Sequence, residues 1–158
     1  MDPASLAPLA RQLLQLFDAA GGESLEISAL AELAGLDLES ETLRTTVDEL
    51  VDQGLLLAGE DSRKFTRSEE GRLVLAGPRD VTLYTRPGCH LCEQAKEAMA
   101  PLLREFGARL REVNIDRDPA LRARYTNDVP VIFLGGRKVA KHRLDPRQFR
   151  RQLEQANR

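Results

Sequence analysis

The first half of the chain combines helical and extended patterns of apolar residues. Apolar positions three or four residues apart favour amphipathic helices, and short β-branched or alternating runs favour strands. The predicted helices cover residues 5–20, 29–34, 40–53 and 68–75, and the predicted strands cover residues 24–27, 55–58 and 64–66. Ser28 is the expected N-cap of the second helix, which stops at Gly35.

The second half follows the order strand, helix, strand, helix, strand, strand, helix. The run 129–134 is apolar throughout, which is typical of a strand covered on both faces. Gly135-Gly136 then favours a hairpin turn. The predicted strands cover residues 81–85, 108–115, 129–134 and 137–142, and the predicted helices cover residues 89–106, 118–125 and 145–156.

Charge separates the same two halves. The 158-residue chain has a net charge of -2, but residues up to Arg79 include 7 basic and 15 acidic side chains, against 16 and 10 from Asp80 onwards. The change coincides with a short Gly-Pro segment at 76–79. The opposite charges indicate either two independently solvated surfaces or two halves that attract and dock. We therefore predict a domain at 1–76, a linker at 77–79 and a domain at 80–158.

The composition limits the cellular compartments in which the protein is expected. The first twenty residues lack the basic leader and apolar stretch of a signal peptide, and no segment approaches the roughly 18 apolar residues of a membrane span. The chain has two cysteines, spaced as a redox pair with none left over for a structural framework. We expect a cytoplasmic protein that makes no membrane contact.

The two cysteines form the motif Cys89-His90-Leu91-Cys92, after a predicted strand and a Pro87-Gly88 turn. A Cys-x-x-Cys motif that opens a helix suits thiol-disulfide exchange, because the unpaired N–H groups and partial positive charge of the helix N-terminus favour thiolate over thiol. Cys89 is the predicted nucleophile, since it is N-terminal in the pair and more exposed to solvent and to the helix dipole. Cys92, one turn further in, would resolve the mixed disulfide.

A zinc site is the competing interpretation of the same spacing. Structural zinc takes four ligands, and the chain offers only His90 and His142 besides the two cysteines. No second Cys-x-x-Cys is present. We therefore predict no metal and no bound cofactor.

The order of elements around the leading motif resembles the thioredoxin fold. More narrowly, Tyr84-Thr85-Arg86-Pro87-Gly88 followed by the cysteine motif is similar to small bacterial glutaredoxin-like proteins, over nearly all of residues 80–158. The resemblance implies an α/β fold of order βαβαββα, and it matches Val129-Pro130 to the family's cis-proline loop. That loop lies against the active-site disulfide and presents backbone to a bound peptide or to glutathione. The Val129-Pro130 bond is then expected to be cis.

The resemblance also suggests roles for residues near the cysteines. Arg86 stands where glutaredoxins often carry a cation that lowers a thiol pKa, and the alternative interpretation is a solvated turn residue. His90, when cationic, would favour the thiolate. Tyr84 is expected either to line the substrate groove with Val129 and Pro130 or to pack as an ordinary core tyrosine.

Two positions depart from the family pattern. Typical glutaredoxins follow the Gly-Gly turn with an acidic pair that grips the glutathione amino group, whereas residues 137–142 are basic here. Arg137 or Lys138 would attract the carboxylates of glutathione or of an acidic partner protein. Leu83 occupies the position at which thioredoxins keep a buried aspartate. Glutathione therefore stays one candidate reductant, and the substrate is a protein disulfide or glutathione itself.

The first half resembles a winged-helix domain: three helices, the second pair in a helix-turn-helix, and then a two-stranded wing. DNA binding needs cations on the recognition helix and wing. The wing offers Arg63, Lys64 and Arg67, but the third helix is acidic, with one Arg44 among its carboxylates: Glu41, Asp48, Glu49 and Asp52. The charge pattern thus favours protein docking or dimerisation over DNA.

Two functional hypotheses follow. The first is a thiol-disulfide oxidoreductase whose N-terminal domain docks a partner or dimerises. The second is a redox-sensing regulator, in which the state of Cys89 and Cys92 changes how the winged-helix-like domain binds DNA or a protein. The sequence leaves the electron donor, the physiological substrate, the redox potential and the oligomeric state open.

Overall fold

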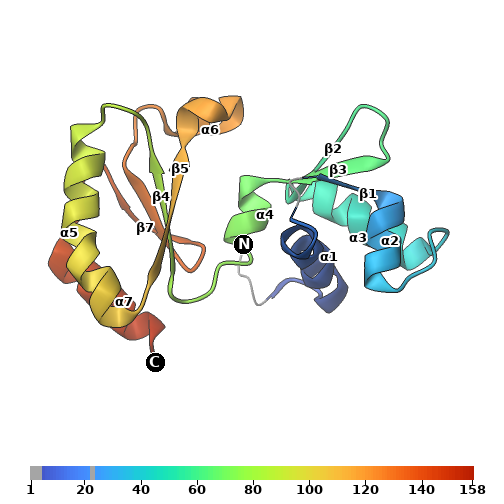
Figure 1. Cartoon of the computed structure of the whole chain (residues 1–158), viewed down its shortest axis with the longest axis horizontal. Coiled ribbons are helices and arrows are strands. Elements are labelled where there is room, and N and C mark those ends of the chain that lie inside the picture. The colour runs from blue at the N-terminus through green and yellow to red at the C-terminus, as the bar shows by residue number, and fades with distance from the viewer. Residues whose placement is uncertain (1–4, 22–23) are drawn as a thin grey trace. The chain divides into compact units, whose positions relative to one another are not determined.

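The structure is a computed structural model that describes residues 5–21 and 24–158. Residues 1–4 and 22–23 of the predicted first domain lie outside the described residues. The chain forms two compact units, Met1–Leu75 and Ala76–Arg158 (Figure 1). Each unit has its own hydrophobic core, and the division lies next to the segment predicted as a linker.

The described residues of the N-terminal unit form four helices and a small antiparallel sheet of strand order β1-β3-β2. In Figure 1 the β2–β3 hairpin extends away from the helices. The elements are α1 (Pro8–Ala19), β1 (Ser24–Glu26), α2 (Ile27–Ala34), α3 (Glu41–Asp52), β2 (Leu56–Ala58), β3 (Lys64–Arg67) and α4 (Glu69–Leu73). Three helices followed by a hairpin is the order that the sequence pattern predicted.

The core of this unit lies between α1, α2 and α3, whose apolar stripes face one another. Its fully buried large residues include Leu13, Leu14, Phe17, Leu30, Leu43 and Leu50. The prediction that Ser28 caps α2 was wrong. The helix begins directly after β1, at Ile27, whose N–H donates to the Arg63 carbonyl, and its N-cap residue is Glu26. Gly35 ends α2 in the left-handed conformation, as expected.

The C-terminal unit has the predicted order βαβαββα, with a short 3₁₀ turn before its second helix. Its four strands form one mixed sheet of order β5-β4-β6-β7. Strands β4 and β5 are parallel, while β6 pairs antiparallel with both β4 and β7. The elements are β4 (Asp80–Thr85), α5 (His90–Phe106), β5 (Arg109–Asn114), η2 (Ile115–Arg117), α6 (Pro119–Tyr125), β6 (Val131–Leu134), β7 (Arg137–Lys141) and α7 (Pro146–Ala156).

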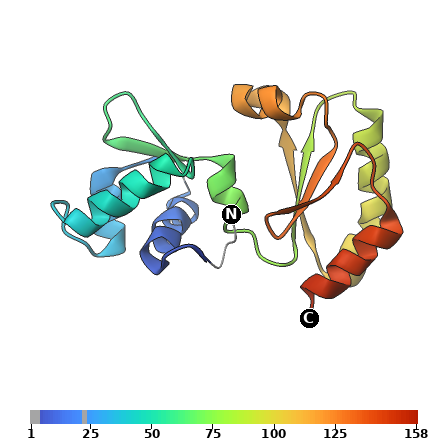
Figure 2. The same ribbon diagram turned by 180° about the vertical axis from the view of Figure 1, so that it is seen from behind.

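Helices α5 and α7 cover one face of this sheet and α6 lies on the other, as Figures 1 and 2 show from opposite sides. Successive residues of a strand point to opposite faces. Leu83 and Ile132 accordingly join the core beneath α5 and α7, whereas Tyr84 points to the other face and stacks on Tyr125 of α6. All four residues of β6 are buried, which confirms the expectation of a strand covered on both faces.

Candidate redox site

The cysteine pair lies where β4 leads through a short loop into α5. Cys89 is the N-cap residue of that helix, and its Sγ accepts a hydrogen bond from the backbone N–H of Cys92 at 3.2 Å. The two side chains are joined by a disulfide, with 5.3 Å between their Cα atoms. The helix N-terminus therefore directs an N–H group at the Cys89 sulfur, and this group favours negative charge there.

The two cysteines differ in exposure. Cys92 is fully buried, whereas Cys89 is partly exposed. An incoming disulfide can therefore reach Cys89 first. This is the order that the sequence predicted for nucleophile and resolving cysteine, and the roles themselves remain predictions.

The start of β6 lies beside the end of β4, because Val131 pairs with Tyr84. The Val129–Pro130 peptide bond is cis, as the resemblance predicted. Part of the backbone of this loop already has partners within the unit: the Val129 N–H donates to the Tyr125 carbonyl at 3.2 Å, and the Pro130 carbonyl accepts from His142 N–H at 2.9 Å. Pro130 is buried and Val129 is partly buried. Their place in a substrate groove remains a prediction.

Arg86 lies in the loop before the cysteines and is neither a free cation nor a purely solvated one. Its guanidinium pairs with the Asp116 carboxylate at 2.8 Å, and both side chains are about one-third exposed, at 32% and 34%. Asp116 had no role in the sequence analysis. The role of Arg86 beside a Cys89 thiolate remains a prediction. Because a carboxylate offsets much of the field of its partner, the stabilisation expected from Arg86 is weaker than the sequence alone implied.

The first turns of α5 carry further charges. His90 is the first residue of the helix and is exposed. Lys96 bonds Glu93 at 2.9 Å and Glu112 at 3.3 Å. These bonds, the one to Glu93 foremost, raise the pKa of Lys96. The carboxylate of Glu93, one residue after Cys92, is thus balanced by a cation.

Tyr84 does not line a groove, so that prediction was wrong. The side chain is fully buried. Its ring stacks on Tyr125 with centroids 4.8 Å apart and meets the edge of Phe133 at 5.5 Å. Tyr84 lies on a central strand, beneath α6, and packing there excludes solvent. The alternative considered from the sequence, an ordinary packed tyrosine, is correct.

A cleft of about 360 Å³ opens beside the first turns of α5. It is lined by Leu91, Gln94 and Ala95 of the helix and by the segment 142–144 that follows β7. His142 turns the chain there with a positive φ of 64°, and the Arg143 N–H donates to the Lys141 carbonyl at 2.7 Å. Nothing in the sequence pattern singled out Arg143, Leu144 or Gln94. The basic run 137–142 pointed to this region but ended one residue short of Arg143.

Two absences concern only the part of the chain that the structure describes. Within residues 5–21 and 24–158, no three His, Cys, Asp or Glu side chains gather as a metal site would need. In the same residues, no helix combines the length and apolar character required to cross a membrane.

On the N-terminal unit, the expectation that Arg67 presents its charge on the wing was wrong. Its side chain is 5% exposed, and its guanidinium pairs with Asp18 and donates to the Leu14 carbonyl at 2.9 Å. The hydrogen bond from Arg67 is the main cause that lowers the pKa of Asp18. Arg67 therefore fastens β3 to α1, and on the wing Arg63 and Lys64 remain exposed.

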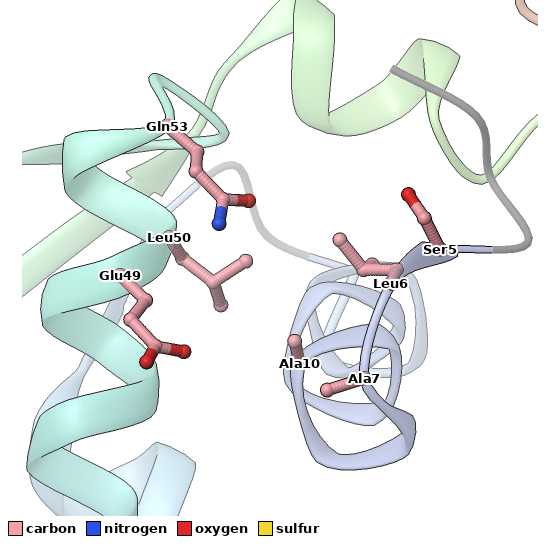
Figure 3. A pocket seen from close by; sticks show the side chains of 7 residues that line it. All are labelled: Ser5, Leu6, Ala7, Ala10, Glu49, Leu50 and Gln53. Carbon is pink, nitrogen blue, oxygen red and sulfur yellow. The ribbon is translucent and has the colours of Figure 1, made fainter.

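A second cleft, of about 260 Å³, lies in this unit between α3 and the N-terminal end of α1 (Figure 3). Leu50 points into it from α3, with Glu49 beside it on the same helix and Gln53 at the C-cap of that helix. Leu6, Ala7 and Ala10 form the opposite wall. Apolar side chains therefore lie on both sides of the cleft. Glu49 adds a carboxylate on the α3 side, near the other exposed carboxylates of that helix.

Fold and site together define the C-terminal unit as a thioredoxin-like domain with a Cys-x-x-Cys at the start of its first helix. A family model described as "Glutaredoxin-like domain (DUF836)" matches residues 80–154. A glutaredoxin-like protein of Dictyostelium discoideum is 33% identical over 81 residues, covering 48% of this chain and 75% of that protein. The chain belongs to this glutaredoxin-like family.

Further relatives match over a similar share. Uncharacterized proteins of Mycobacterium bovis and Mycobacterium tuberculosis are each 32% identical over 75 residues, covering 44% of this chain and 77% of the relative. A structural-genomics target protein of X. campestris, solved by X-ray methods, is 37% identical and covers 48% of this chain and 96% of its own, with a TM-score of 0.41.

Proposed function

We propose that the C-terminal unit is a thiol-disulfide oxidoreductase that uses Cys89 as nucleophile and Cys92 as resolving cysteine. The observation that carries the proposal is the hydrogen bond from Cys92 N–H to Cys89 Sγ at the start of α5. In the reduced protein the same N–H group would stabilise a Cys89 thiolate. The partial exposure of Cys89 and the burial of Cys92 support the division of roles.

The reaction proceeds in two exchanges. The Cys89 thiolate attacks one sulfur of a substrate disulfide, an S–S bond forms between them, and the other substrate sulfur leaves as a thiolate that takes a proton from water. Cys92 then loses its proton to water and attacks Cys89 Sγ. The Cys89–Cys92 disulfide forms and the second substrate sulfur leaves. The substrate has gained the two electrons that the protein has lost.

Regeneration needs a thiol reductant. Two molecules of glutathione, or one dithiol protein, would reduce the Cys89–Cys92 disulfide and be oxidised to a disulfide themselves. We propose glutathione as one candidate donor and a disulfide-containing protein as the substrate. The basic stretch 137–141 supports a donor or substrate that carries carboxylates.

The test is disulfide reduction by the full chain, with dithiothreitol as the electron source and an insulin disulfide as the substrate. We expect turnover by the native protein, none by Cys89→Ser and a trapped mixed disulfide with Cys92→Ser. Turnover that survives the loss of Cys89 overturns the proposal. Replacing dithiothreitol by glutathione tests the donor separately.

We propose that the N-terminal unit docks a protein partner or a second copy of the chain. Its α3 presents exposed carboxylates, and its single arginine, Arg44, pairs with Glu39 at 2.8 Å. Arg63 lies 4.0 Å from Asp61, which further reduces the positive charge of the wing. Such a surface would repel a phosphate backbone.

The regulator hypothesis is tested on the same protein. Fluorescence anisotropy with a random-sequence DNA duplex at low salt should give no binding for either the reduced or the oxidised chain. Binding that changes with the redox state of Cys89 and Cys92 would overturn the docking proposal and favour a redox-sensing regulator. Sedimentation of the full chain separates self-association from docking to another protein.

A further inference from the structure

Two clefts of the C-terminal unit meet at one segment of chain. The cleft beside α5 includes residues 142–144. Another cleft of this unit, of about 230 Å³, lies between β7 and α7. Arg143 and Leu144 line both. The two clefts thus adjoin at these residues and are together called the β7 groove here. Its lining includes Leu91, which lies between the two cysteines in sequence, and Gln152 on α7.

The β7 groove borders on the candidate redox site. Leu91, Gln94 and Ala95 belong to the helix that Cys89 caps. On the opposite wall, His142 donates its N–H to the carbonyl of Pro130, the residue that follows the cis bond. A ligand in the groove therefore lies next to both elements that carry the chemistry.

The groove suits an extended polypeptide. Strand β7 is the last strand of its sheet, and the free side of an edge strand offers backbone N–H and C=O groups to an added strand. The walls also include apolar side chains that are partly exposed and would contact residues of such a segment: Val139, Ala140 and Leu144.

The charged side chains around the groove indicate which charge a ligand should carry. Lys141 and His142 each lie 3.6 Å from Asp128, and the carboxylate of Asp145 caps α7 by accepting from the N–H of Arg147 at 2.9 Å. Arg137, Lys138 and Arg143 are exposed, and among the described residues their side chains form no ion pair. Unneutralised cations beside the groove match a segment that carries carboxylates.

We propose that the β7 groove binds an extended acidic polypeptide segment next to the disulfide of a protein substrate. The proposal rests on the oxidoreductase function and specifies its substrate class. Arg143 is the central specificity residue, because it lines both halves of the groove.

The test uses synthetic peptides with one cysteine held in a mixed disulfide with 5-thio-2-nitrobenzoate. Three peptides differ only in the residues beside that cysteine, which are Glu, Gln or Lys. Reduced Cys92→Ser protein attacks through Cys89, forms a mixed disulfide with the peptide and releases the coloured thiolate. We expect the Glu peptide to react about tenfold faster than the Gln peptide at low salt, with the advantage lost at high salt.

Charge reversal at Arg143 separates the groove from a general attraction. In Arg143→Glu, with Cys92→Ser retained, the preference should invert so that the Lys peptide reacts fastest. The control is Arg104→Glu, which makes the same charge change at an exposed position on α5 outside both clefts and should leave the order of the peptides unchanged. Thermal melting verifies that each variant is folded.

Three outcomes overturn the proposal. The Glu and Gln peptides react at equal rates with the native groove, or Arg104→Glu inverts the preference as Arg143→Glu does, or oxidised glutathione loses as much rate as the Glu peptide in Arg143→Glu. The last result would make the groove a site for small anions. Failure of the oxidoreductase proposal would give a different result from these three, because none of the peptides would then react through Cys89.

Discussion

The backbone N–H of Cys92 donates to Cys89 Sγ at 3.2 Å, so the two cysteines are linked by a helix-cap hydrogen bond as well as by their disulfide. The donor is one of the N–H groups that the first turn of α5 leaves without a helical partner. The cap places the partial positive charge of the helix at one sulfur only.

This asymmetry predicts selective alkylation of the reduced protein. The Cys92→Ser variant, which keeps Cys89, should react with iodoacetamide at pH 7 about ten times faster than a free cysteine, because more of its sulfur is thiolate. The Cys89→Ser variant should react far more slowly than a free cysteine, since Cys92 is buried. Mass spectrometry of timed samples gives both rates. Equal rates for the two variants would contradict the assignment of the nucleophile.

The ion pair between Arg86 and Asp116 predicts opposite effects of its two partners. In the Cys92→Ser background, Asp116→Asn frees the guanidinium and should raise the alkylation rate of Cys89 at pH 7 about twofold to threefold, whereas Arg86→Ala should lower it. Arg104→Ala removes a cation from the far end of α5 and serves as the control. If neither substitution changes the alkylation rate of Cys89, Arg86 is a structural residue of the turn and does not stabilise the thiolate.

The burial of Tyr84 predicts a loss of stability without a specific loss of chemistry. Tyr84→Ala removes a fully buried ring from between Tyr125 and Phe133 and should lower the free energy of unfolding of the C-terminal unit by about 3 to 5 kcal/mol. Urea denaturation followed by near-UV circular dichroism measures it. A milder variant, Tyr84→Leu, should keep the Cys89 alkylation rate within about twofold. If Tyr84→Leu had native stability but reduced substrate slowly, the result would contradict this prediction and favour a place for Tyr84 in the substrate groove.

The pair of Arg67 and Asp18 predicts a pH-dependent contribution to the stability of the N-terminal unit. Because the folded state lowers the pKa of Asp18 below its ordinary value of 3.8, the contribution is complete above that value and is lost as the pH falls through the lowered one. Asp18→Asn should cost about 2 kcal/mol at pH 7, since it weakens a charged hydrogen bond to a buried guanidinium. The difference from the native protein should shrink in strong acid.

Urea unfolding at several pH values measures this difference. The two tyrosines of the chain, Tyr84 and Tyr125, both lie in the C-terminal unit, so their fluorescence follows that unit alone while far-UV circular dichroism follows both. Asp61→Asn is the matched control, because the pKa of Asp61 is also lowered but mainly by backbone hydrogen bonds in an exposed turn. A pH-independent cost of Asp18→Asn would contradict the linkage.

The sequence was sufficient for much of the local structure of the C-terminal unit. Asp118 and Asp145 cap the helices they were expected to open, and the order of helices and strands along the chain agrees with the prediction. The sequence failed where a distant partner decides. Tyr84 and Arg67 are polar-tipped residues on strands, and only the packing of α6 and of α1 determines that both are buried.

The candidate site shows the same division. The position of Cys89 at a helix start could be read from the spacing of neighbouring residues, because Pro87-Gly88 and the helical pattern fix it. The left-handed turn at His142 could not, since residues other than glycine rarely adopt a positive φ and nothing in the neighbouring sequence singles out His142 as one that does. Without the turn, nothing in the sequence connects Arg143 with Leu91, roughly fifty positions earlier.

In the proposed exchange reaction, the unequal burial of the two cysteines would also affect how long a substrate stays bound through its mixed disulfide with Cys89. To release the substrate, the buried sulfur of Cys92 would have to reach that bond from inside the protein. A substitution that loosens the first turn of α5 should then change the lifetime of the mixed disulfide.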